Sequence, residues 1–203
     1  PIAPGVVRYK YEVTRDKKNA QTNVVTVDLN NPYIKINTVA GGGTYTNKAT
    51  VSQMADRTNA VALVNGDFFT MQLQGVPLGA SIIDGDMKSS PAVLTDIWSF
   101  GIDENNTAFI DSTKFVGSVT APNGKSYPID GLNKTFYWYQ PSKEYSHESK
   151  IQMYNSFWSS KSRGDKTAGE VLLSEDNLVE QIVYRKNIDM KIPEGKKILQ
   201  VSG

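Results

Sequence analysis

The segment AVALVNGDFF, residues 60–69, decides how the fold of this chain is interpreted. Five small apolar residues run directly into an amide, a glycine and a carboxylate, and two phenylalanines follow. An apolar run without polar alternation is typical of a strand that is buried on both faces. The sequence therefore predicts a core strand over residues 60–64 that ends abruptly in polar side chains.

The polar end of this segment has two interpretations. Asn-Gly is the commonest dipeptide of two-residue turns, because both residues tolerate positive φ. Alternatively, a strand end places polar groups on a rigid support, as binding and catalytic loops do. In that case Asn65 and Asp67 are the candidates for contacting a ligand, and Gly66 lets the ligand approach the backbone. Phe68 and Phe69 then line the pocket or simply pack.

A second segment of similar composition follows, GVPLGASIIDGD at residues 75–86. Three of its residues would shape a loop around a ligand: Gly75, Pro77 and Gly79. Asp84 and Asp86 flank a glycine, which predicts a tight turn in a hairpin. Such paired carboxylates are usually a solvated turn, but they also suit a divalent cation or acid–base chemistry.

The rest of the chain has mainly the pattern of strands. Alternating residues predict strands over 6–14, 23–29 and 33–40, a further strand over 150–158 and a last one in KILQVS. Turn residues predict three hairpins, centred on residues 103–106, 123–124 and 175–177. One helix is predicted over residues 50–58, where Thr50 and Gln53 fit a capping box. The expected fold class is α+β, with a strand-dominated mixed sheet and few helices.

Composition narrows the classes of function. The 203 residues carry 22 basic and 21 acidic side chains and no cysteine. The net charge of +1 argues against a nucleic-acid surface, and no apolar run is long enough for a membrane span. A thiol nucleophile and a cysteine zinc site are excluded. His147 is the only histidine and is expected in a solvated loop, so any divalent cation would be held by oxygen ligands.

Two further patterns suggest carbohydrate or anion binding. The aromatic run TFYWYQ, residues 135–140, would stack on sugar rings or fill one face of a sheet. The loop SSKSRGDKT, residues 159–167, contains Lys161, Arg163 and Lys166, which would attract an anionic glycopolymer.

Taken together, VSQMADRTNAVALVNGDFF and GVPLGASIIDGDM resemble the N-terminal half of the phosphodiester glycosidase family, which includes the lysosomal uncovering enzyme. The resemblance extends to PGVVRYKY, WSFGIDENNTAFI and the closing IPEGKKILQVSG, and so covers nearly the whole chain. It divides the chain into a main-domain portion over residues 1–113, a β-rich insert or subdomain over 114–192, and a return strand to the main domain over 193–203.

The resemblance implies hydrolysis of sugar phosphodiesters of a surface glycopolymer or glycoconjugate, by an exported or cell-surface protein. Asn65 and Asp67 match the polar motif of the family and are implied to be catalytic. Gly66, Phe69, Gly75, Pro77, Gly79 and Asp84 are implied to bind substrate. Family members continue into a second half that the printed sequence lacks, so a C-terminal half on the same or a separate chain is an expected partner. The alternative is a non-catalytic module that binds a surface glycan.

Overall fold

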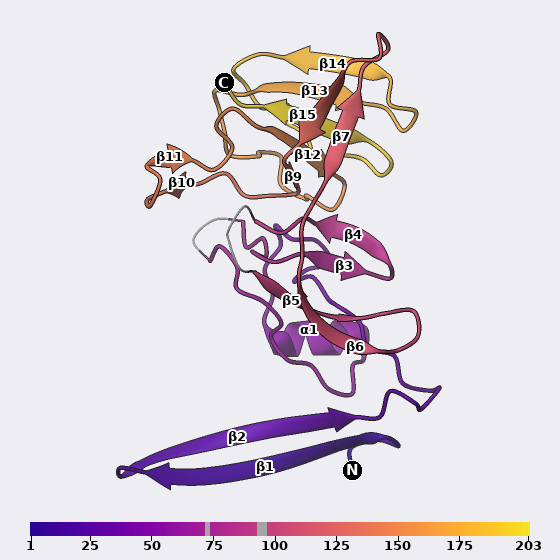
Figure 1. Ribbon diagram of the computed structural model, residues 1–203, viewed down its shortest axis with the longest axis vertical. Coiled ribbons are helices and arrows are strands. Elements are labelled where there is room, and N and C mark those ends of the chain that lie inside the picture. Colours follow the sequence, from indigo (N-terminus) through magenta and orange to yellow (C-terminus); the bar gives the residue numbers. More distant parts are fainter. Residues whose placement is uncertain (72–73, 93–96) are drawn as a thin grey trace.

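The computed structural model of the chain describes residues 1–71, 74–92 and 97–203 (Figure 1). Strands dominate these residues, with a single helix among them, so the predicted strand-dominated α+β class is confirmed. The molecule is elongated, with a long β ribbon at one end and a five-stranded sheet at the other (Figure 1). No helix within the described residues is long and apolar enough to cross a membrane.

The N-terminal ribbon pairs β1 (Val6–Arg15) with β2 (Lys18–Val27) along their full lengths. Their turn places Asp16 and Lys17 at positive φ, as a two-residue hairpin that follows the strand twist requires. The predicted strands over 6–14 and 23–29 are therefore confirmed, although the second begins earlier. The predicted strand over 33–40 is wrong, because this segment forms no strand and the Tyr33 side chain is almost fully exposed.

The predicted helix is confirmed as α1 (Val51–Thr58). Thr50 accepts a hydrogen bond from the backbone of Gln53, and the Gln53 side chain returns one to Thr50, which completes the capping box. Asn59 ends the helix in the left-handed conformation. No residue of α1 is fully buried, so its short apolar face is only partly covered within the described part of the chain.

The apolar run at residues 60–64 does not form the core strand that its sequence predicts. It has no strand partner among the described residues, and Val61 and Val64 are 58% and 84% exposed. A run of this kind becomes a buried strand only when neighbours pair with its backbone and cover both faces. The described residues supply neither.

The middle of the chain forms three separate two-stranded hairpins. They are β3 (Ser81–Ile83) with β4 (Asp86–Ser89), β5 (Trp98–Ile102) with β6 (Ala108–Ser112), and β7 (Gly117–Thr120) with β8 (Ser126–Ile129). The hairpins predicted around residues 84–85, 103–106 and 123–124 are confirmed. Large apolar side chains of this region are more than half exposed, including Trp98, Phe100, Ile110 and Val116.

The C-terminal part holds the five-stranded sheet, in the order β14-β13-β15-β12-β9. The strands are β9 (Gly131–Leu132), β12 (Ile151–Asn155), β13 (Gly169–Leu173), β14 (Val179–Val183) and β15 (Lys197–Val201). All neighbours are antiparallel except β12 and β9. The segment expected as a return strand, residues 193–203, contributes β15 to the middle of this sheet. A small hairpin, β10 (Trp138–Tyr139) with β11 (Glu144–Tyr145), projects beside it (Figure 1).

The hydrophobic core lies on this sheet. Tyr154, Leu172 and Ile198 occupy aligned positions on β12, β13 and β15 and pack with Trp158. From the N-terminal part, Ala40, Tyr45 and Val76 enter the same cluster. These insertions fasten the loops around residues 45 and 76 to the C-terminal sheet.

A row of buried polar side chains crosses the same face of the sheet. Gln152, Gln200 and Glu170 are aligned on β12, β15 and β13 and are nearly inaccessible to solvent. Glu170 receives a bidentate ion pair from the fully buried Arg163, with Nε–Oε1 and Nη2–Oε2 distances of 2.7 and 3.0 Å. His147 is also buried, at 2% exposure, so its prediction as a solvated loop residue is wrong.

Candidate functional site

The two polar motifs of the sequence meet in one short hairpin. Phe69 lies opposite Pro77 in an isolated β-bridge, and the Leu78 amide donates to the Phe68 carbonyl at 2.9 Å. Gly75 takes a φ of +84° near the turn of this hairpin, a conformation that favours glycine. The stem of Lys48 packs against the same glycine, since a Cβ there would lie 2.5 Å from Lys48 Cγ.

Asp67 is fixed by the second motif. Its Oδ2 accepts a hydrogen bond of 2.8 Å from the Gly79 amide. A Cβ on Gly79 would lie 2.8 Å from the same oxygen, so any larger residue would displace the carboxylate. Gly79 is buried, whereas Asp67 remains largely accessible. The hairpin thus presents one anchored carboxylate to solvent.

Lys134 supports the hairpin from behind. Its ammonium donates to the Pro77 carbonyl at 2.8 Å and to the Ser90 carbonyl at 2.7 Å, and it lies 3.2 Å from Ser89 Oγ. A fourth acceptor, the Leu78 carbonyl, lies at 3.5 Å, so all three donors of the ammonium have acceptors. Burial lowers the pKa of Lys134 to about 7, and the negative charge of Asp67 opposes that shift. Lys134 therefore holds the Pro77 segment in place in the neighbourhood of the Asp67 carboxylate.

Lys134 also joins the hairpin to the C-terminal sheet. Its carbonyl accepts a 2.9 Å hydrogen bond from the hydroxyl of Tyr154, which lies in the core. The preceding residue, Asn133, is fully buried and donates to the Lys88 carbonyl and to Asn155 Oδ1. Residues 133–134 therefore connect β4, β12 and the 75–79 strand.

Two hydroxyl groups lie in the same neighbourhood. Burial raises the pKa of Tyr45 to about 12, the Ser81 hydroxyl opposes this shift, and Asp67 adds to it. Within the described residues neither the Tyr45 nor the Ser81 hydroxyl completes a hydrogen bond, although both are buried. The Tyr45 ring packs edge-on against Phe157 at a centroid distance of 4.7 Å, which holds the hydroxyl in place.

The remaining predicted residues are placed as follows. Asn65 and Gly66 lie in an exposed segment before Asp67, and open space surrounds a Cβ built on Gly66. Phe69 is 44% exposed. Asp84 lies in the exposed β3–β4 turn, where it pairs with Lys35 at 2.7 Å instead of meeting Asp67. The Lys35 contact lowers the pKa of Asp84, as expected for a carboxylate next to an ammonium.

The carboxylates of the two motifs do not form a cation site. Asp86 pairs with Lys88 at 2.6 Å, just as Asp84 pairs with Lys35. Among the described residues, no group of three or more His, Asp or Glu side chains has the arrangement needed to hold a metal ion. The candidate site is therefore a single accessible carboxylate, Asp67, whose charge acts on the buried Lys134 and Tyr45.

Sequence reasoning did not find Lys134, Tyr45 or Ser81. Lys134 and Tyr45 are distant in sequence from Asp67, whereas Ser81 lies within the 75–86 segment but has no distinguishing pattern of its own. Nothing in the local pattern around Lys134 distinguishes it from the exposed lysines. The glycine-rich segment around Tyr45, GGGTYTNKA, has the composition of a flexible loop and gives no signal that its tyrosine is buried.

The comparisons with known proteins bear on the fold. The chain is similar to the crystal structure of a hypothetical protein from Synechocystis, with a TM-score of 0.79 and 16% sequence identity. The match covers 98% of this chain and 36% of that one, so the chain spans about a third of the length of its neighbour. No model of a protein family and no curated protein matches the sequence.

Proposed function

We propose that the chain is part of a phosphodiester glycosidase-like domain that hydrolyses sugar phosphodiesters of a surface glycopolymer or glycoconjugate, in a secreted or cell-surface protein. The observation that supports this most directly is the hydrogen bond from the Gly79 amide to Asp67. It joins the two motifs on which the resemblance depends and leaves the carboxylate accessible at the hairpin surface.

In this proposal Asp67 is the residue that contacts the reacting bond. Cleavage of a glycosidic bond needs a proton at the leaving oxygen and stabilisation of positive charge at the sugar carbon. A carboxylate can serve either need, depending on its protonation. Lys134 is a positioning residue, because its donors are occupied by backbone and hydroxyl oxygens. Asn65 offers an amide at the open side, where it would bind sugar hydroxyls or phosphate oxygens.

The test measures release of free sugar from a synthetic glycosyl phosphodiester, using the chain together with the C-terminal half that the resemblance implies. Asp67→Ala should abolish turnover and Asn65→Ala should reduce it. Asp86→Ala is the matched control, because it removes an exposed carboxylate that faces Lys88 instead of Gly79. Unchanged turnover in both the Asp67 and the Asn65 variant would eliminate this site.

We also propose that a further polypeptide segment packs against the exposed apolar residues between positions 60 and 110. The 60–64 run has the pattern of a buried strand yet is exposed, and the neighbouring hairpins expose Trp98, Phe100 and Ile110. Two-stranded hairpins are only marginally stable without further strands or a covering layer. The occupant is therefore a strand-forming segment with aliphatic side chains, from the same protein or a separate chain. Its presence should slow amide hydrogen exchange at residues 60–64, and unchanged exchange would refute this assignment.

The alternative function is glycan binding without turnover. It is favoured by the β10–β11 hairpin, where Trp138 and Tyr145 are each nearly half exposed and lie edge-on with centroids 5.0 Å apart. Exposed aromatic faces of this kind suit the apolar faces of sugar rings. Two results together would favour this alternative. The protein would show no turnover even with the implied C-terminal half present, and it would bind a glycan with an affinity that is lost in Trp138→Ala.

A further inference from the structure

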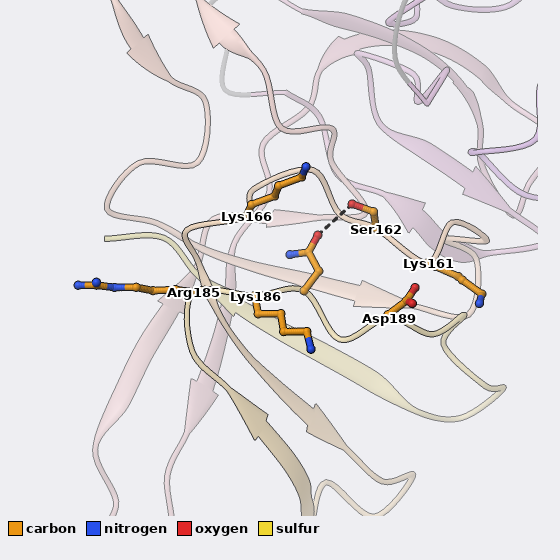
Figure 2. A pocket seen from close by; sticks show the side chains of 7 residues that line it. Lys161, Ser162, Lys166, Arg185, Lys186 and Asp189 are labelled. Atoms are coloured by element: carbon orange, nitrogen blue, oxygen red, sulfur yellow. Dashed lines mark hydrogen bonds between the residues drawn. The ribbon is translucent and has the colours of Figure 1, made fainter.

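A cationic pocket lies on the C-terminal part of the molecule, and none of its lining residues belongs to the Asp67 hairpin. Its volume is about 320 Å³, which is at the small end of the range for ligand pockets. Two chain segments form it, residues 161–166 and residues 185–189 (Figure 2). The residues that line it are Lys161, Ser162, Lys166, Arg185, Lys186, Asn187 and Asp189.

The charge of this pocket is not neutralised by the protein. Four of the lining side chains are cationic and one is anionic. Across the described residues, Lys161, Lys166, Arg185 and Lys186 take part in none of the ion pairs, and their side chains donate no hydrogen bond. The chain as a whole has a net charge of only +1, so this concentration of positive charge is local.

The two segments are held rigidly together by Asn187. Its Oδ1 accepts hydrogen bonds from Ser162 Oγ and from the Arg163 amide, each at 3.0 Å. Its Nδ2 donates to the Asp165 carbonyl at 2.7 Å and to Glu170 Oε1 at 3.1 Å. Figure 2 shows the Asn187–Ser162 bond, with Lys166 and Lys186 on opposite sides of it.

The buried ion pair below the pocket fixes the same two segments. Arg163 lies in the first segment and contacts the Ile188 carbonyl of the second, while Glu170 accepts from the Ile188 amide at 2.7 Å. Arg185 itself adopts a left-handed φ of +53°, which is unusual for a residue with a side chain. This frame fixes the backbone of the two segments that carry the cationic side chains, whereas the side chains themselves leave it in different directions, with Arg185 extending outward (Figure 2).

We propose that this pocket binds the phosphate group of a phosphorylated carbohydrate. Uncompensated lysine and arginine side chains provide charge and donors for phosphate oxygens. Asp189 adds a carboxylate, which suits the hydroxyl groups of a sugar. The pocket would hold such a group either as a free sugar phosphate or as one unit of a phosphate-bearing polymer. The proposal does not depend on hydrolysis at Asp67.

The experiment titrates the protein with glucose 6-phosphate by calorimetry, with glucose and inorganic phosphate as separate probes. Glucose 6-phosphate should bind more tightly than inorganic phosphate, glucose should not bind, and added salt should weaken binding. Lys166→Glu combined with Lys186→Glu should reduce affinity at least about tenfold, since it replaces two of the four cationic side chains with anionic ones. The matched control, Lys18→Glu combined with Lys114→Glu, reverses two exposed charges elsewhere and should retain the wild-type affinity.

A phosphate-linked polysaccharide distinguishes the two sources of the ligand. The polymer and glucose 6-phosphate are compared at equal concentrations of phosphate groups. Tighter binding of the polymer supports a polymer as the ligand, and tighter binding of glucose 6-phosphate supports a free sugar phosphate. The proposal is overturned if no probe produces saturable binding, if inorganic phosphate binds as tightly as the sugar phosphate, or if the folded double charge reversal binds normally. Asp67→Ala should bind like the wild type, which separates this site from the proposed hydrolytic one.

Discussion

Replacing Glu170 with alanine should destabilise the protein more than any loss of a surface charge. The carboxylate is fully buried and accepts hydrogen bonds from five donor atoms at 2.7–3.1 Å. Those atoms belong to Arg163, Asn187, Ile188 and Gln200. The substitution leaves the guanidinium of Arg163 buried without its counter-charge.

The magnitude follows from this geometry. Removing one partner of a buried ion pair typically costs about 3–5 kcal/mol, because the remaining charge stays desolvated. For a chain of this size, each kcal/mol lowers the melting temperature by roughly 2–4 °C. Glu170→Ala should therefore lower the midpoint of thermal unfolding by roughly 6–20 °C.

Two assays at pH 7 measure the change, urea denaturation for the free energy of unfolding and thermal denaturation for the midpoint, both monitored by tryptophan fluorescence. The buried Trp158 reports directly on the core next to this network. Glu180→Ala provides the control, since the carboxylate of Glu180 pairs with Lys196 at 2.6 Å but is partly exposed. Exposed ion pairs of this kind contribute about 0–1 kcal/mol.

A double variant tests whether the cost arises from the unpaired charge. Arg163→Met combined with Glu170→Leu should be more stable than Glu170→Ala, because it buries no charge at all. A loss below about 1 kcal/mol in Glu170→Ala would refute the reasoning, as would a double variant less stable than the single one.

Three further predictions concern other buried contacts. Burial lowers the pKa of His147 to about 4, so the unfolded chain takes up a proton at higher pH than the folded one and the free energy of unfolding falls, by roughly 3 kcal/mol at most, as the pH is lowered from 6.5 toward 4. The difference in the free energy of unfolding between pH 7 and pH 4.5, measured with urea, should be smaller in His147→Gln than in the wild type. Lys134→Met should cost about 1–3 kcal/mol by leaving two carbonyls unpaired, and should speed hydrogen exchange at the Gly79 amide. Gly79→Ala should lower the free energy of unfolding by about 1–3 kcal/mol, because the new Cβ would meet the Asp67 carboxylate. The same substitution should have a much smaller effect in an Asp67→Ala background, which a double-mutant cycle measures.

The sequence by itself determined the features that depend on a few neighbouring residues. The capping box of Thr50 and Gln53 starts α1, and Asp84 and Gly85 take the positive φ values of a tight hairpin turn. The turn at Gly124 likewise takes its expected form. Each of these depends on backbone conformation and hydrogen bonds within about four residues, so the local pattern contains the necessary information.

Only the tertiary structure decided what lies around those elements. Asp67 meets Gly79 across a hairpin, and Lys134 reaches the same strand from more than fifty residues away. Arg163, whose sequence context suggests an exposed loop, is buried because Glu170 and the Ile188 carbonyl satisfy it. The run at 60–64 shows the converse, since an apolar pattern forms a buried strand only where other segments provide ladder partners and a covering layer. Burial and pairing are properties of the whole assembly of segments, and so the local sequence specifies the element but not its surroundings.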